Sequence, residues 1–124
     1  MQALAKAAIA SLVIITATGC AAMHVYDGPP RSREQVSVIT GVDTYGYIVA
    51  FTKVDGKGIK RFSQAPTEIV VLPGKHEIET LCWMRGGRAS TNVISIDTQA
   101  GVDYQAIIVG LNRKCSTMIN IMQK

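Results

Sequence analysis

The sequence predicts an all-β protein: a small antiparallel β-sandwich of about seven strands that follows an N-terminal signal helix and a tether. Three observations support this fold class. Short segments rich in β-branched and aromatic residues recur along the chain. Turn-forming pairs that contain glycine or proline separate these segments at intervals of about 8 to 12 residues. No stretch after the tether has a sustained apolar period of 3.6 residues, so we expect no long helix in the domain.

The first nineteen residues have the three parts of an export signal. A short start carries one basic side chain, Lys6, and residues 7–16 form the almost wholly apolar run AAIASLVIIT. Small residues follow at positions 17–19, as in a secretory signal peptide. The apolar run is shorter than the roughly 20 residues that span a membrane. A buried N-terminal helix is the alternative, but the run shows no amphipathic period.

The signal leads directly to Cys20. The stretch Ala17-Thr18-Gly19-Cys20 resembles a bacterial lipobox. The resemblance implies that residues 1–19 are removed and that the Cys20 thiol carries lipid, including palmitate. In lipoproteins of this type, aspartate after the cysteine retains the protein in the inner membrane; residue 21 is alanine here, so the resemblance implies the periplasmic face of the outer membrane. Several acyl chains on one residue make a stable anchor. Ordinary signal-peptidase cleavage after Ala22 stays the alternative.

Residues 20–33 are expected to form an extended tether between the lipid and the domain, because they contain Gly28, Pro29 and Pro30 and have no period. Residues 34–124 would form one small domain. Without Lys6 the chain has 12 basic and 9 acidic side chains, a net charge of +3. Because this charge is small and scattered, and because the protein is exported, we expect no nucleic acid among its partners.

The first strands are expected at 35–40, where Val36 and Val38 share a face, and at 47–54. Asp55-Gly56 then predicts a turn. Residues 57–66 look like a loop, with a short strand near Ile59. The next strand, 67–72, ends at Pro73-Gly74, a pair suited to the central positions of a turn.

The second half of the chain repeats this pattern. The strand expected at 75–84 is broken by Gly86-Gly87, and Ile94 and Ile96 share a face in the strand at 90–97. In the last expected strand, 116–122, Ile119 and Ile121 share a face. In the strand at 102–109, the residues expected on one face are Val102, Tyr104, Ala106 and Ile108.

The chain contains three cysteines, Cys20, Cys82 and Cys115. If Cys20 is lipidated, two cysteines are left in an oxidising compartment. Strand parity places Cys82 with Ile78 and Cys115 with Ile119, so both thiols point toward the core and we predict a Cys82–Cys115 disulfide. Two buried free thiols are the alternative. Neither histidine stands at zinc-ligand spacing from a cysteine, so no metal and no cofactor are expected.

The same parity predicts an exposed aromatic side chain. Leu81 and Trp83 share a face with Glu77 and Glu79, which should point to solvent. An exposed Leu81–Trp83 pair would mark a surface that contacts a partner. The alternative is a bulge that returns Trp83 to the core. The candidate contact patch consists of Leu81, Trp83, Arg85 and Arg88.

Short motifs along the chain resemble two groups of bacterial proteins. The motifs VDGK at 54–57, LPGKHEI at 72–78 and AGVDY at 100–104 resemble PEGA-type β-sandwich modules of surface proteins. The motif YDGPPR at 26–31, ahead of the first strand, resembles small uncharacterised proteobacterial lipoproteins. The resemblance implies a sandwich fold and a surface or periplasmic setting, and neither group brings catalytic residues.

The sequence contains none of the catalytic motifs G-x-S-x-G, H-E-x-x-H or a phosphate-binding glycine loop. His76 and Glu77 cannot act together, because adjacent strand residues face opposite ways. We therefore expect no enzyme, but a lipid-anchored periplasmic protein that binds or scaffolds another envelope component, a protein or a glycan. The alternatives are a small-ligand or glycan-binding lipoprotein, or an inhibitor of a wall-degrading enzyme. A pocket with converging polar groups would favour ligand binding, and a cluster of His76 with carboxylates from other strands would favour an enzyme.

Overall fold

The computed structural model describes residues 23–44, 46–59, 65–84, 88–109 and 115–122. The export signal, Cys20 and the cleavage site expected after Ala22 lie outside these residues. Within them the chain forms ten β-strands and one 3-10 turn, Arg33–Gln35, and contains no α-helix. The all-β prediction is therefore confirmed.

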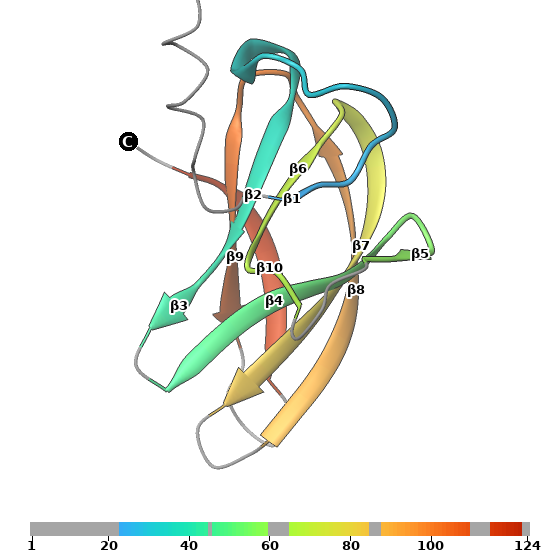
Figure 1. Ribbon diagram of the computed structural model, residues 1–124. Helices are drawn as coiled ribbons and strands as arrows, with labels where there is room; N and C mark the ends of the chain where they lie inside the picture. The colour runs from blue at the N-terminus through green and yellow to red at the C-terminus, as the bar shows by residue number, and fades with distance from the viewer. Residues whose placement is uncertain (1–22, 45, 60–64, 85–87, 110–114, 123–124) are drawn as a thin grey trace, which may run out of the picture.

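The strands form two sheets that pack face to face (Figure 1). Sheet A has the order β1-β6-β2-β9-β10 and sheet B the order β3-β4-β7-β8, with β5 paired to β4. The strands of sheet A are β1 (Met23–His24), β6 (Glu68–Val71), β2 (Ser37–Gly41), β9 (Asp103–Val109) and β10 (Ser116–Ile121). Those of sheet B are β3 (Asp43–Thr44), β4 (Tyr47–Val54), β5 (Lys57–Gly58), β7 (Gly74–Met84) and β8 (Arg88–Thr98).

Seven of the described strands have four or more residues, and they coincide with the seven predicted ones. The other three, β1, β3 and β5, have two residues each, too few to show an alternating pattern. We had expected a wholly antiparallel sandwich, but the structure also contains parallel strand pairs. Strand β2 runs parallel to β9, and β1 runs parallel to β6. Between β2 and β9 the chain passes through sheet B, crosses sheet A once as β6 and passes through sheet B again, so that β9 enters beside β2 from the same end.

The segment predicted to be an extended tether contributes its residues 23–25 to sheet A. Met23 and His24 pair with Ile69 and Val70, and the Val25 N–H donates to the Val70 carbonyl at 3.0 Å. Part of residues 20–33 therefore lies against the domain, and the sheet begins before residue 34.

The apolar core lies between the two sheets. Its members are the inward side chains of the central strands, and Phe51, Ile39 and Ile69 are fully buried. In β2 the member of the core cluster is Ile39, and Val36 and Val38, which were expected to share a face, are buried as well. The core cluster comprises Ile39, Val49, Phe51, Val54, Ile69, Val71, Ile78, Tyr104 and Ala106.

A disulfide and a group of hydroxyls join the sheets on the β8–β10 side. Cys82 of β7 bonds to Cys115, which precedes β10, with their Cα atoms 6.1 Å apart and both side chains buried. This confirms the predicted pairing. The Thr80 and Thr117 hydroxyls lie 2.7 Å apart. The Ser90 hydroxyl also donates to the Cys115 carbonyl at 2.8 Å. On the β8–β10 side of the sandwich, polar and covalent links thus add to the apolar packing between the sheets.

Candidate functional site

A tight turn places the first functional side chain. The Asp55-Gly56 pair joins β4 to β5, and both residues have positive φ, 52° and 82°. A two-residue hairpin with both central residues in this region is a type I′ turn, for which Asp-Gly is a preferred sequence. The predicted turn therefore also sets the direction of the Asp55 carboxylate.

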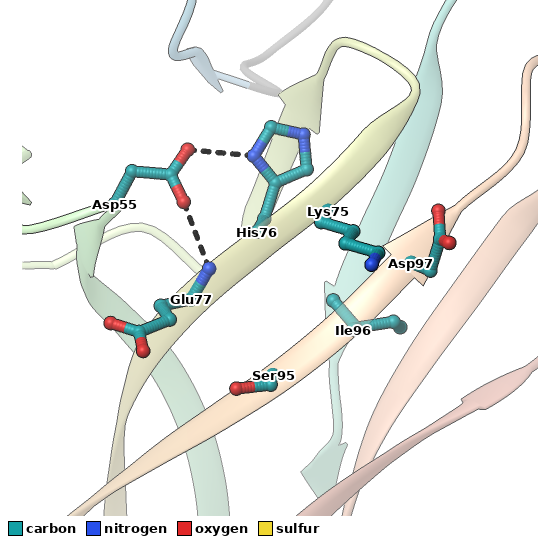
Figure 2. Close-up of a pocket in the computed structure, with 7 residues that line it drawn as sticks. All are labelled: Asp55, Lys75, His76, Glu77, Ser95, Ile96 and Asp97. Carbon is teal, nitrogen blue, oxygen red and sulfur yellow. Dashed lines mark hydrogen bonds and ion pairs between the residues drawn. The ribbon is translucent and has the colours of Figure 1, made fainter.

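The Asp55 carboxylate closes a small hydrogen-bonded cluster against β7 (Figure 2). Its Oδ2 atom lies 2.7 Å from His76 Nδ1, and its Oδ1 atom accepts the Glu77 backbone N–H at 2.8 Å. The Asp55 N–H in turn donates to the Glu77 carbonyl at 2.7 Å. We call Asp55 and His76 together the Asp–His clamp. The clamp fastens the β4–β5 hairpin to the beginning of β7.

Both ring nitrogens of His76 face oxygen acceptors. Nδ1 meets the Asp55 carboxylate and Nε2 lies 2.6 Å from the Leu72 carbonyl oxygen. Each ring nitrogen is therefore taken up by a contact within the fold. The His76 side chain is also only 14% exposed. In this arrangement neither ring nitrogen is open to a substrate, and the contacts of His76 are those of a structural residue.

The pKa of Asp55 lies below its ordinary value of 3.8. Desolvation is the largest influence and raises this pKa. The hydrogen bonds from His76 and from the Glu77 backbone, together with the positive charges of His76 and Lys57, lower it and prevail. Because the Asp55 side chain is 47% exposed, water screens these interactions. Asp55 is therefore a carboxylate that stays ionised in the folded protein at neutral pH.

Two hollows adjoin the clamp. The larger, of about 400 Å³, lies beside the β7–β8 ladder, where Lys75 and Asp97 are cross-strand neighbours (Figure 2). The smaller, of about 290 Å³, lies between β1 and β5. Asp55 lines both. The larger hollow thus combines charges of both signs with an apolar side chain, and it is lined by Asp55, Lys75, His76, Glu77, Ser95, Ile96 and Asp97.

The second candidate site lies on the outer face of sheet B. Trp83 is 41% exposed, so the bulge that would have returned it to the core is absent. It pairs across the strands with Ile48 and Ala89, while Leu81 is half-buried beside it. Val93 on β8 is 62% exposed. We call this surface the outer apolar patch, and define it as Ile48, Leu81, Trp83 and Val93.

The structure brings together only some of the residues predicted for the contact patch. The side chains of Leu81 and Trp83 point to the same face of β7. Val93, which pairs with Glu79 from the neighbouring strand, points to that face too. Arg88 begins β8, but its side chain is outside the described part, as is all of Arg85. Val93 was missed because it faces away from the isoleucines of its own strand. Its outward parity was the available signal.

The sequence also did not reveal the Asp–His clamp. Both local signals were visible, the Asp-Gly turn and the histidine after Pro73-Gly74, but 21 residues separate Asp55 from His76. Only the β4–β7 register, in which Val54 faces Ile78, brings them together. A pattern within one strand cannot predict such a pairing.

No protein-family model, curated protein or solved structure matches this chain. The resemblances to PEGA-type modules and to proteobacterial lipoproteins therefore stay predictions. Among the residues that the structure describes, no group of three metal-ligating side chains occurs. The same described residues include no helix that is long and apolar enough to cross a membrane.

Proposed function

We propose that the protein is a lipid-anchored component of the bacterial cell envelope that binds or scaffolds another envelope protein through the outer apolar patch. The observation that carries this proposal is the exposure of Trp83, 41%, on the same face of sheet B as Val93, which is 62% exposed and lies diagonal to Leu81. Tryptophan is among the residues that contribute most to protein interfaces when a partner covers it. Exposed apolar side chains gathered on one face indicate such a surface.

The edge of sheet B supports a protein as the partner. Strand β8 has eleven residues, and among the described strands it pairs only with β7. An added strand from a partner would hydrogen-bond to this edge and lie beside Val93. Val93 belongs both to the outer apolar patch and to this edge strand, so one bound segment can use both, beyond the part of β8 where Ser90 and Asn92 contact the Cys115 carbonyl.

The N-terminal sequence supports the location. Residues 17–20 resemble a lipobox, and Cys82 and Cys115 bond to each other, which leaves Cys20 as the remaining cysteine. Disulfides persist in an oxidising compartment such as the periplasm. Radiolabelled palmitate should enter the wild type and not Cys20→Ser. Equal labelling of the two proteins would contradict the anchor.

Site-specific crosslinking in intact bacteria tests the contact surface. A photoreactive amino acid replaces Trp83 in one full-length variant and Met118 in the other. Met118 is equally exposed, at 41%, but lies on sheet A. We expect position 83 to give a discrete adduct with a second envelope protein, and Val93→Lys to reduce that adduct. Equal adduct patterns from both positions, or no adduct from position 83, would refute the proposed surface.

The larger hollow favours a second candidate function, the binding of a small polar ligand or glycan fragment. It combines Lys75 and Asp97 with the apolar Ile96 in about 400 Å³, a volume within the range of ligand sites. Titration with soluble peptidoglycan fragments, followed by NMR, tests it. Shifts confined to Lys75 and Asp97 that vanish in Lys75→Ala would support a glycan site, whereas unchanged spectra would exclude one for these fragments.

A further inference from the structure

We propose that the side of the sandwich formed by β1 and β5 faces the lipid surface in which Cys20 is anchored, because the docked strand β1 leaves a link too short for the opposite orientation. The lipid anchor at Cys20 is part of the function proposed above, and the orientation rests on it. The orientation adds which side of the domain lies against the membrane and which side is left open to a partner.

Strand β1 is held to the domain by its backbone and by a side chain. Met23 and His24 pair in parallel with Ile69 and Val70 of β6. The Val25 N–H donates to the Val70 carbonyl at 3.0 Å, and the Val25 side chain packs against the apolar core. The chain is therefore fixed to sheet A from Met23 onward, and only the residues before it can act as a link to the lipid.

The docking of β1 makes this link short. Three residue steps separate Cys20 from Met23, and a fully extended chain covers about 10 to 11 Å in three steps. A tether that was free from Cys20 to Glu34 would have fourteen steps and could reach about 46 to 50 Å. The docked strand thus keeps the edge of sheet A close to the lipid headgroups.

The order of the strands identifies the side that comes close. Strand β1 is the outermost strand of sheet A, and β5 pairs with the outer side of β4 in sheet B. Residues of both strands line the smaller hollow, of about 290 Å³, so β1 and β5 form the same side of the sandwich. Strands β8 and β10 end the two sheets on the opposite side.

The width of the sheets prevents the opposite orientation. Four strand spacings separate β1 from β10, which amounts to about 19 Å at about 4.8 Å each. If β10 or β8 lay against the lipid, Met23 would stand away from the surface by roughly this width, and a link of about 10 to 11 Å does not reach so far. The β8 edge, with Val93, therefore points away from the membrane, where a partner in the periplasm can approach it.

The side chains of the β1–β5 side suit a layer of lipid headgroups. Lys57 is exposed, and a lysine can extend its ammonium group to lipid phosphates while its methylene groups lie along apolar surface. The rings of His24 and Tyr26 lie 5.0 Å apart after the start of β1, and tyrosine combines an apolar ring with a polar hydroxyl, as membrane interfaces favour. The acidic side chain that lines the same hollow, Asp55, is turned to the Asp–His clamp.

NMR of the full-length protein in phospholipid nanodiscs tests the orientation. The discs consist of phosphatidylethanolamine and phosphatidylglycerol, with a small share of lipid that carries a nitroxide on its headgroup. The nitroxide broadens the signals of amides that lie near it. We expect the Gly58 amide of β5 to lose most of its signal intensity and the Val93 amide of β8 to keep it. Equal losses at the two positions would overturn the proposal.

Two insertions of the same length distinguish a docked β1 from a free tether. A flexible insert of about ten glycine and serine residues adds roughly 16 to 19 Å of average reach. Between Ala22 and Met23 it lengthens the link, so the Gly58 signal should recover. Between Pro29 and Pro30 it follows the docked strand, so the Gly58 signal should stay as weak as in the wild type. Equal recovery with both inserts would show that β1 does not hold the domain, and the proposal would be wrong.

Failure of the orientation and failure of the anchor give different results. If palmitate enters the wild type and not Cys20→Ser, but the Gly58 and Val93 signals are lost equally, the anchor stands and the orientation is wrong. If palmitate labels both proteins equally, the anchor is wrong and the orientation is wrong with it.

Discussion

Replacement of Gly41 by alanine should strongly destabilise the protein, because Gly41 lies where the chain passes from sheet A to sheet B. Gly41 is the last residue of β2, and its N–H donates to the Thr67 carbonyl at 2.7 Å. The next residue, Val42, links to Ala106 of sheet A and Val49 of sheet B. A Cβ atom on Gly41 would overlap the backbone oxygen and carbon of Val49.

The magnitude follows from the type of atom that the methyl group meets. A side chain can change rotamer, but the Val49 carbonyl belongs to a central strand, so β4 would have to move away from β2. Overpacking of a well-filled interior costs about 1 to 3 kcal/mol, and we expect the upper end of this range. For a domain of this size, a loss of about 3 kcal/mol lowers the melting temperature by roughly 12 to 24 °C.

Thermal unfolding followed by circular dichroism tests this prediction, with Gly58→Ala as the matched control. Gly58 is also a strand glycine, but a Cβ atom there meets nothing within 4 Å. Alanine at position 58 should therefore leave the melting temperature unchanged or raise it, through the lower entropy of the unfolded chain. If Gly41→Ala melted within about 2 °C of the wild type, less than the shift expected for even 1 kcal/mol, the described crossing between the sheets would be wrong.

Three further predictions concern the links between elements. Replacement of both Cys82 and Cys115 by alanine should lower the free energy of unfolding, measured in urea, by at least about 3 to 4 kcal/mol. This is the chain-entropy value for a loop with a sequence separation of 33 residues. A loss below about 1 kcal/mol would contradict a stabilising disulfide. For Asp55→Asn, the sign follows from the lowered pKa: the ionised carboxylate stabilises the fold above pH 3.8, and this contribution is lost as the pH falls through the lower native pKa. The difference in unfolding free energy between wild type and Asp55→Asn should thus shrink below pH 3.8, and a difference that persists in strong acid would refute the role of the carboxylate. Thr80→Val should cost about 1 kcal/mol, because it leaves the half-buried Thr117 hydroxyl without its partner at 2.7 Å, whereas Thr80→Val combined with Thr117→Val should cost no more than the single change. Additive losses in that double-mutant cycle would show that the two hydroxyls do not interact.

The residues that form strands were predictable, because strand formation depends on local alternation and turns. Strand β4 has the predicted bounds, Tyr47–Val54, and the parity of Cys82 and Cys115 correctly indicated two inward thiols. Parity also indicated the outward direction of Trp83. Parity did not predict burial at the end of β10: Ile121 has the inward parity of Ile119 but is exposed.

The pairings between distant strands could not be predicted in the same way. The parallel contact of β2 with β9 joins Val38 to Asp103, and no pattern within either strand specifies that neighbour. The Asp–His clamp depends on the β4–β7 register for the same reason. In β2, the sequence VSVI offers apolar residues on both faces, so alternation alone did not distinguish Ile39 from Val38 as the core residue.

The parallel pairing of β2 with β9 also dictates the order in which the chain acquires its structure. The β7–β8 ladder joins neighbours in sequence and can form as soon as both strands exist. Sheet A cannot, since β2 needs a strand that begins 65 positions after Val38, at Asp103. Pairings of such long range are slow to form. A nascent chain that lacks β9 leaves one side of β2 without its neighbour, so the chain must emerge through Val109 before its first half can settle into its final arrangement.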